Sequence, residues 1–258
     1  MTTMPAKWVF REAGDFAAMS LDTVRAAFRR PVQWREFVEQ LWFVASVSIL
    51  PTCLVAIPFG AIIALQTGAL IRQLGAVSLN GGASVVAVVR EASPIVTALI
   101  IAGAAGSAIC ADLGSRKIRD EIDAMETLGI SPLHRLVVPR VGAVMVVALL
   151  LNGLVSVVGV AGGYFFSVVV EKGTPGPYFA SFTELAQLPD LFQAEAKAVV
   201  FGFVAALVAS YQGLRAKGGP KGVGDAVNQS VVFTFMLLFA INFVATAIYT
   251  QVVPQKAL

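Results

Sequence analysis

Long apolar runs alternate with short polar segments along this chain of 258 residues. A helix needs about 20 consecutive, mostly apolar residues to cross a bilayer. Five runs reach that length, and we expect spans at about 41–65, 84–111, 141–170, 194–214 and 223–253. The runs do not alternate residue by residue as strands of a membrane β-barrel do. The pattern therefore predicts an all-α membrane protein with five transmembrane helices, forming one membrane domain over 41–253.

Residues 1–40, before the first span, have a different pattern. From Phe16 to Arg30, apolar side chains recur at helical spacing and arginines occupy the other face. This arrangement is typical of a helix that lies in the headgroup plane. The alternative is a helix that packs on a partner outside the membrane. The tryptophans lie at or before the first span, as in an interfacial anchor: Trp8, Trp34 and Trp42.

The segment between the second and third spans, residues 115–129, predicts a short charged helix. Ser115 is the expected N-cap, Gly129 the expected left-handed residue at the end, and Pro132 prevents continuation. Apolar residues recur at i, i+4, i+7 and i+10, which gives one narrow stripe. We expect a separate soluble motor to dock on this stripe and its flanking charges: Arg116, Ile118, Glu121, Ile122, Met125, Glu126, Leu128 and Gly129.

The charges of this helix support docking over self-stabilisation. Its oppositely charged residues at i, i+4 spacing have the base first, which is the weaker order within a helix. These pairs are Arg116–Asp120, Lys117–Glu121 and Arg119–Asp123. Because they add little to the stability of the helix, recognition by a partner is the better account of them.

The distribution of lysine and arginine predicts the orientation in the membrane. The chain has 19 of them against 16 acidic residues, and 14 fall in three segments that a five-span topology places on one side: 1–40, 115–140 and 215–221. Cytoplasmic loops carry such an excess. We therefore expect a multi-pass protein of the cytoplasmic (inner) membrane, with the N-terminus and the charged helix in the cytoplasm. The segment 171–190 and the tail 254–258 are expected outside, and no nucleic-acid partner is expected.

Few residues offer catalytic or metal chemistry. The sequence has no GxxxxGK[ST] loop for ATP, no HExxH and no GxSxG. Its only histidine is His134, and Cys53 and Cys110 lack metal-ligand spacing. We therefore predict a transport subunit that is not itself an enzyme, binds no cofactor or metal, and depends on a partner for ATP hydrolysis.

Three ionisable residues fall in or near the spans: Arg90, Glu91 and Lys197. A charge at the centre of a span costs about 2.5–3.5 kcal/mol on insertion scales. Two interpretations remain open, namely snorkelling at the outer interface or a Glu91 side chain that lines a substrate route. For Asn152, in the third span, we expect a hydrogen bond between helices.

The block from Arg90 to Val141 contains REASPIVTALIIAGAAG followed by DLGSRKIRDEIDAMETLGISPLHRLVVPRV. It resembles the MlaE/YrbE family of ABC-transporter permeases, which are the membrane subunits of MCE-type lipid transport systems. The resemblance extends to LQTG at 65–68, AKAVVFGF at 196–203 and GVGDAVNQSVV at 222–232. It implies an interfacial helix and five spans, a second permease chain, a cytosolic ATPase dimer that binds ATP and Mg²⁺, and an extracytoplasmic MCE hexamer.

The resemblance also implies a lipid cavity formed by the first, second and fifth spans near the interface of two permease chains. Its candidate residues here are Leu65, Gln66, Arg90, Glu91, Pro94 and Asn242. The chain departs from the family at 103–106, where many members have an arginine in Gly-Arg-x-Gly and this chain has Ala104.

The amino-acid sequence of the charged segment is most similar to those of the actinobacterial YrbE branch. That resemblance implies import of fatty acids, sterols or phospholipids by a pair of different permease chains. The alternative is a membrane scaffold that assembles MCE proteins through 171–190 without moving a substrate itself.

Overall fold

The computed structural model describes residues 6–29, 31, 33–75, 79–170 and 172–252. Arg30, the side chain of Trp8 and the expected tail 254–258 lie outside the described residues. Within those ranges the chain is helical and has no strand. Helices long and apolar enough to cross a membrane are Trp34–Gln73, Asn80–Ile118, Leu133–Val170, Leu188–Leu214 and Gly219–Gln251. The prediction of an all-α, five-span membrane protein is confirmed.

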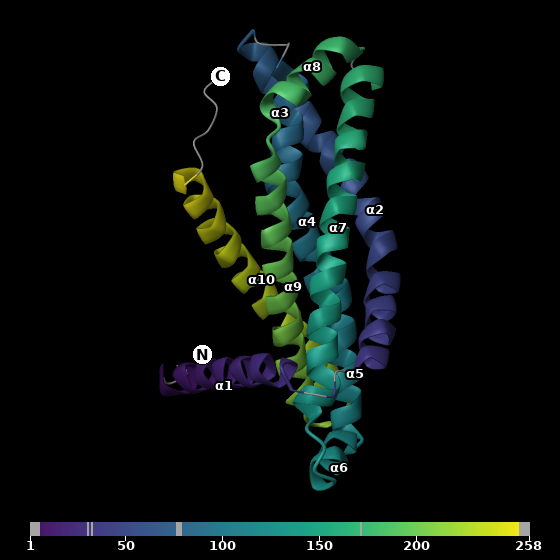
Figure 1. Ribbon diagram of the computed structural model, residues 1–258, viewed down its shortest axis with the longest axis vertical. Coiled ribbons are helices and arrows are strands. Elements are labelled where there is room, and N and C mark those ends of the chain that lie inside the picture. Colours follow the sequence, from purple (N-terminus) through teal and green to yellow (C-terminus); the bar gives the residue numbers. More distant parts are fainter. Residues whose placement is uncertain (1–5, 30, 32, 76–78, 171, 253–258) are drawn as a thin grey trace.

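The spans form a bundle along the long axis of the molecule (Figure 1). In chain order the helices are α1 (Ala6–Ala27), α2 (Trp34–Gln73), α3 (Asn80–Ala87), α4 (Ser93–Ile100), α5 (Ser107–Ile118), α6 (Glu121–Thr127), α7 (Val138–Tyr164), α8 (Pro175–Leu185), α9 (Leu188–Leu214) and α10 (Gly219–Val252). Short π-helical segments lie within the second and third spans. In the second span they are η2 (Val88–Ala92) and η3 (Ile101–Gly106), and in the third they are η4 (Leu133–Val137), before α7, and η5 (Phe165–Val170), after it.

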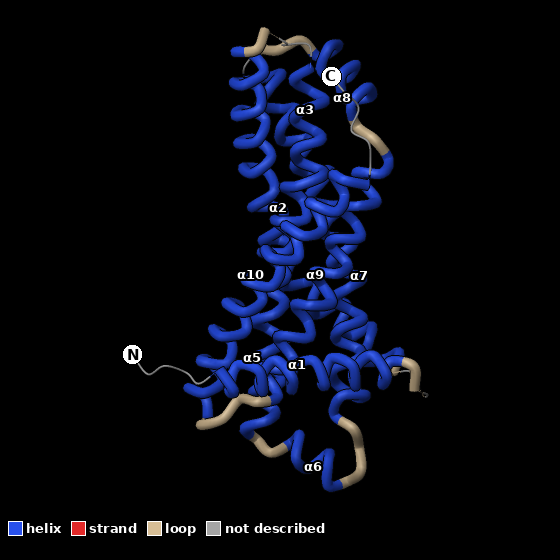
Figure 2. Tube along the Cα trace, turned by 90° about the vertical axis from the view of Figure 1, so that its left-hand side faces the viewer, coloured by secondary structure: helices blue, strands red, loops and turns tan. Residues whose placement is uncertain are grey.

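The two ends of the bundle differ. At one end α1 lies across the bundle and α6 projects beyond it, and at the other end α8 lies beside α3 (Figures 1 and 2). We call these the α6 end and the α8 end. Figure 1 also shows α10 diverging from α9 toward its C-terminal end.

The helix α1 has the properties expected of an interfacial helix. Phe10 and Phe28 are exposed, while Thr23 and Ala26 are buried against the bundle. An ion pair also fastens the helix, because a carboxylate oxygen of Glu12 lies 3.0 Å from Arg215 Nη2 at the end of α9. The exposed aromatic side chains are available to the headgroup region of a bilayer.

The first span runs through its two prolines as one helix. The helix α2 begins at Trp34, before the expected Leu41, and continues to Gln73 across both Pro51 and Pro58. A helix is the only way for a lipid-exposed segment to satisfy its backbone groups, and neighbouring helices stabilise proline positions within it. Pro51 and Pro58 therefore lie inside a continuous helix and do not divide the span.

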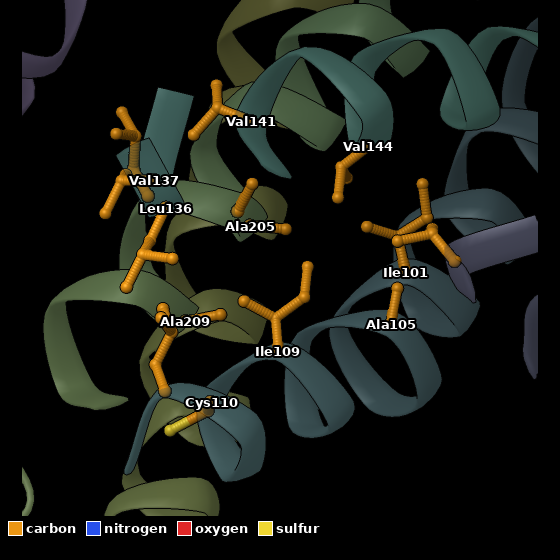
Figure 3. Close-up of a cluster of buried hydrophobic side chains, with 14 of the residues drawn as sticks. Ile101, Ala105, Ile109, Cys110, Leu136, Val137, Val141, Val144, Ala205 and Ala209 are labelled. Atoms are coloured by element: carbon orange, nitrogen blue, oxygen red, sulfur yellow. The ribbon is translucent and has the colours of Figure 1, made fainter. Parts of the chain in front are cut away.

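A buried apolar core joins the spans at the α6 end of the bundle. It includes Ile101 and Ile109 from the second span, Val144 from α7, and Ala205 and Ala209 from α9. Figure 3 shows these side chains directed toward one another from the three helices. This core fixes the position of the segment that carries α6.

Small residues let the helices approach closely where they cross. A Cβ atom added to Gly60 of α2 would lie 2.1 Å from the carbonyl oxygen of Gly159 of α7. One added to Gly213 of α9 would lie 2.9 Å from the carbonyl oxygen of Cys110. Both contacts are with backbone atoms, which cannot move aside without separating the helices. Close approach of this kind is a main source of attraction between helices in lipid.

We expect Gly60→Ala to lower the stability of the purified chain by about 1–3 kcal/mol, as overpacking in a tight core does. The measurement is the thermal unfolding of the chain in detergent. Gly103→Ala is the matched control, because a Cβ atom at this helical glycine meets nothing within 4 Å. Equal melting temperatures for the two variants would contradict the assignment of Gly60 to a close helix crossing.

The segment 171–190 contains α8, which packs on the start of α3. A Cβ atom at Gly82 would lie 2.2 Å from the carbonyl oxygen of Ser181, and the Gly82 amide donates a hydrogen bond to Ser181 Oγ at 3.0 Å. Tyr178 is buried in the same contact, and this burial raises the pKa of its hydroxyl above the usual value. The helix α8 is thus fixed on the bundle.

Candidate coupling helix and intramembrane polar cluster

The charged segment folds as two helices with a break between them. The second span continues as α5 to Ile118, and Asp120 then adopts a left-handed conformation with φ 58°. Aspartate tolerates this conformation better than most residues. Ser115 lies within α5, where its hydroxyl donates to the carbonyl oxygen of Asp112 at 2.8 Å. The prediction that Ser115 begins the helix is wrong, because the span does not stop where its apolar run stops.

The end of α6 has the predicted geometry. Gly129 has φ 73°. Its amide donates to the carbonyl oxygen of Glu126 at 3.0 Å, and the Ile130 amide donates to that of Met125 at 2.9 Å. This is the pair of hydrogen bonds that closes a helix through a glycine in the Schellman motif. The assignment of Gly129 as the left-handed terminating residue is confirmed.

The predicted apolar stripe does not face one way. Ile122 is 3% exposed within the core of the chain, and Met125 packs against that core. Leu128, in contrast, is 76% exposed. Ile122 is therefore not available to a partner in this structure, and neither is most of Met125. The four residues of the stripe do not share one face, because the break at 119–120 takes Ile118 out of register with α6 and Leu128 lies just after the last residue of α6.

The exposed large apolar residues of the segment 119–132 are Leu128 and Ile130, with the exposed carboxylate of Glu126 beside them in the chain. Figures 1 and 2 show α6 as the outermost element of the α6 end. Ile130 was not among the residues expected from the sequence. A large apolar residue directly after a terminating glycine could have indicated it.

The ion pairs also differ from the i, i+4 pairs expected. Glu121 lies 3.0 Å from Arg119 and 3.9 Å from Arg116, and Lys117 pairs with Asp123. Each pair crosses the break between α5 and α6. Exposed pairs of this kind contribute little individually, but together they set how α6 is placed relative to α5.

A fully buried arginine lies directly behind this region. Arg140, at the start of α7, has no exposed surface. It donates to Asp112 Oδ2 at 2.5 Å and to the Leu136 carbonyl oxygen at 2.8 Å, and its Nη1 lies 3.9 Å from Glu36 of α2. Asp112 also accepts from Arg116 at 3.2 Å. This charged cluster joins α2, α5 and α7.

From the sequence alone, Arg140 counts only as one of the basic residues of the segment 115–140. Its burial follows from the position of Asp112, 28 residues away in the chain, so no local pattern indicates it. With Arg116, the cluster continues through Glu121 to α6. The projecting helix is therefore connected to three spans by charged contacts.

A second polar cluster lies within the spans. Lys197 of α9, which is buried, has its Nζ 3.5 Å from Glu91 of η2 and donates to Thr246 Oγ1 of α10 at 2.7 Å. Thr246 in turn donates to Glu91 at 3.3 Å. Lys197 therefore compensates the charge of Glu91, and the three residues join three helices.

Arg90, the neighbour of Glu91, has different partners. Its guanidinium carbon lies 4.7 Å from the ring centre of Tyr249, a distance at which a cation is attracted to an aromatic face. The Tyr249 hydroxyl donates to Asp190 at 2.7 Å. Tyr249, near the C-terminal end of α10, is thus joined to η2 through Arg90 and to the start of α9 through Asp190. Both Arg90 and Glu91 lie in a π-helical segment, and such segments occur frequently at functional sites.

Asn152 of α7 makes the interhelical hydrogen bonds expected of it. Its Oδ1 accepts from Ser93 Oγ at 2.8 Å, and its Nδ2 donates to Glu195 of α9 at 3.1 Å. Ser156 donates to Ser93 at 2.9 Å. The prediction for Asn152 is confirmed, and Glu195 is a further carboxylate that the sequence did not single out.

The remaining cavity candidates are not all brought together. Leu65 and Gln66 are exposed on α2, which supplies no residue to the Glu91 cluster. Pro94 is buried next to η2. Asn242 is half-buried on α10, one turn before Thr246, and its Oδ1 has no hydrogen-bond partner among the described residues.

The spacing of polar residues on α10 could have revealed more of this site. Asn242, Thr246 and Tyr249 recur at i, i+4 and i+7, which places them on one face of a stretch, 235–249, that is otherwise apolar. The partners of Tyr249 and Thr246 on α9, Asp190 and Lys197, are also seven residues apart and so lie on one face. The pairing of Lys197 with Glu91 depends on how the helices pack, and no local pattern indicates it.

Fold and site together define a polytopic α-helical membrane protein with a charged helix projecting from one end and a polar cluster within its spans. Residues 37–248 match the family described as Permease MlaE. The chain belongs to the MlaE family of permeases and is an ABC transporter permease. A subunit of this class carries a transport route and works with an ATPase partner.

Relatives extend over most of the chain. A probable ABC transporter permease protein of Synechocystis is 33% identical over 209 residues, covering 81% of this chain and 80% of that protein. One of Rickettsia bellii is 28% identical over 239 residues, covering 93% and 92%. The chloroplastic protein TRIGALACTOSYLDIACYLGLYCEROL 1 of Arabidopsis thaliana is 28% identical over 251 residues, covering 96% of this chain and 70% of that protein.

Proposed function

We propose that this chain moves lipids across the cell envelope, driven by a cytosolic ATPase dimer that docks on α6 and supplies the ATP and Mg²⁺ site. The observation that carries the proposal is the exposed pair Leu128 and Ile130 at the tip of a helix that projects from the bundle. The pair offers a small apolar anchor with a carboxylate, Glu126, beside it. Such anchors, surrounded by polar residues, supply much of the binding energy of protein interfaces.

A displacement of α6 has a direct route into the membrane. Ile122 anchors the helix in the core, and Arg116 links it to Asp112 and so to Arg140. From there the second span is one continuous helix, Asn80–Ile118, which carries Glu91 near its other end. Movement of α6 would therefore alter the contacts of Glu91 with α9 and α10.

A lipid is the substrate that this polar cluster suits best. Glu91, Arg90 and Lys197 offer charge and hydrogen-bonding groups inside an otherwise apolar bundle, which matches a molecule with a polar head and apolar chains. The name of the Arabidopsis relative contains that of a galactolipid, which supports a lipid substrate. A second permease chain, of the same or a different sequence, would complete the cavity beside Leu65, Gln66 and Asn242.

The α6 end is assigned to the cytoplasm because most of the lysines and arginines flank it. The N-terminus is then cytoplasmic and the C-terminus extracytoplasmic in the inner membrane. An MCE hexamer would bind at the α8 end, where Phe179 of α8 is exposed. Import is the direction implied by the resemblance to YrbE chains.

The second candidate is a scaffold that holds MCE proteins without moving lipid. The observation that favours it is the rigid attachment of α8 to Gly81 and Gly82, which presents Phe179 on a fixed surface. A reconstituted complex that requires this chain for MCE assembly, but shows no ATP-dependent lipid movement, would support the scaffold over the transporter.

The test of the transport proposal is the double variant Leu128→Asp, Ile130→Asp. We expect at least about tenfold less ATPase to copurify with it, since two apolar anchors are replaced by charges. ATP-dependent movement of fluorescent phospholipid in reconstituted vesicles should fall in parallel. Leu74→Asp is the matched control, because Leu74 is 80% exposed and lies at the opposite end of the bundle.

Normal ATPase binding by the double variant would refute docking at α6. Normal binding without lipid movement in the unaltered complex would instead refute the substrate assignment. Ile122 is not a suitable position for this test, because its burial would make any charged substitution a folding defect.

A further inference from the structure

A cavity of about 390 Å³ lies at the α6 end, between α1 and the bundle. Its volume is within the range of small-molecule sites, about 300–1,000 Å³. The walls are mostly apolar and come from four helices, with Thr23 and Val24 from α1, Trp34 and Phe37 from α2, Val141 and Met145 from α7, and Phe203 from α9. The cavity is separate from the Glu91 cluster and shares no residue with it.

The polar residues around this cavity are basic or neutral. Arg29 and His134 line it, and the His134 ring lies 3.3 Å from the carbonyl oxygen of Arg29. Arg135 donates to Gln33, another lining residue, at 3.5 Å. No carboxylate occurs among the described lining residues. An apolar interior is thus bordered by cationic groups on one side.

We propose that this cavity binds one acyl chain of an anionic membrane lipid, with its phosphate held by Arg29, His134 and Arg135. A helix in the headgroup plane, as we expect α1 to be, would bring the cavity to the depth where phosphates and acyl chains meet. Basic residues near the surface attract anionic lipids, and an acyl chain in an apolar cavity gains dispersion contacts with its walls.

The bound lipid would act as a structural ligand of α1. It would pack between α1 and α7 and so hold the C-terminal end of α1 on the bundle, in addition to the contact of Glu12 with Arg215 nearer the N-terminal end of this helix. The proposal does not rest on lipid transport or on ATPase docking, and it stands or fails separately from them.

The experiment uses the purified full-length chain and native mass spectrometry. The probes are phosphatidylglycerol and phosphatidylcholine with identical acyl chains. We expect one phosphatidylglycerol to be retained per chain in preference to phosphatidylcholine. The variant Arg29→Gln, Arg135→Gln should weaken this retention about tenfold. The control is Arg11→Gln, Arg25→Gln, which removes the same charge from exposed positions of α1 that do not line the cavity.

A second variant, Met145→Trp, tests the apolar part by filling the cavity. It should displace the lipid although Arg29 and Arg135 remain in place. Equal retention of the two lipids by the unaltered chain would overturn the proposal. An equal loss of phosphatidylglycerol in the two double-arginine variants would also overturn it, because it would indicate a general surface attraction. Retention of phosphatidylglycerol that survives Arg29→Gln, Arg135→Gln would do the same, because these side chains would then not hold its phosphate.

Discussion

Arg140→Met is expected to destabilise the purified chain by about 3 kcal/mol. Removing one partner of a buried ion pair typically costs about 3–5 kcal/mol, because the other charge is left uncompensated. The lower end applies here, since Arg116 remains beside Asp112 at 3.2 Å. Thermal or denaturant unfolding in detergent measures the effect. Arg11→Met, which removes an exposed arginine of α1, is the control.

The double variant Arg140→Met, Asp112→Leu separates lost charge from lost packing. Replacing both partners of a buried pair with apolar residues is often nearly neutral, so we expect the double variant to recover much of the stability lost by Arg140→Met. If the stability losses of the single variants Arg140→Met and Asp112→Leu simply add in the double variant, the two residues do not interact. The assignment of this cluster as the link between α2, α5 and α7 would then be wrong.

Lys197→Met is expected to have the second large effect, because it leaves Glu91 without a counter-charge inside the membrane. A charge at the centre of a span costs about 2.5–3.5 kcal/mol on insertion scales, and Glu91, which lies toward one end of the second span, should cost less than this. We expect a lower melting temperature and less lipid copurifying with the complex. Lys221→Met, at an exposed lysine, is the control.

Adding Glu91→Gln to Lys197→Met distinguishes stability from function. The double variant removes the uncompensated charge, so its melting temperature should return toward that of the unaltered chain. Copurified lipid should remain low if these groups contact the substrate. Full recovery of lipid in the double variant would show that the pair serves only to stabilise the bundle.

The spans were predictable from the sequence because their signal is local. A run of apolar residues long enough to cross a bilayer has few alternatives to a helix. The termination at Gly129 was predictable for the same reason, since a left-handed turn at a helix end favours glycine. Neither inference requires knowledge of how the helices pack.

The details of the coupling region depend on packing and could not be predicted in this way. Ile122 and Leu128 belong to the same apolar pattern, yet one is buried and the other exposed, because Ile122 lies in the first turn of α6 and Leu128 follows the last residue of that helix. The pairing of Arg140 with Asp112 likewise needs two spans to be placed side by side. Periodicity gives the face of a helix but not its neighbour.

The π-helical segments η2 and η3 allow the second span to change its length and twist. A π-helical turn contains an extra residue compared with an α-helical one, and in an α-helix each residue adds about 1.5 Å and 100° of rotation. Conversion of either segment from a π-helical to an α-helical turn would therefore rotate and shift the part of the helix on one side of it relative to the part on the other side. Since η2 holds Glu91 and η3 lies between it and α6, the rod that joins the two ends of the molecule contains two such points of adjustment.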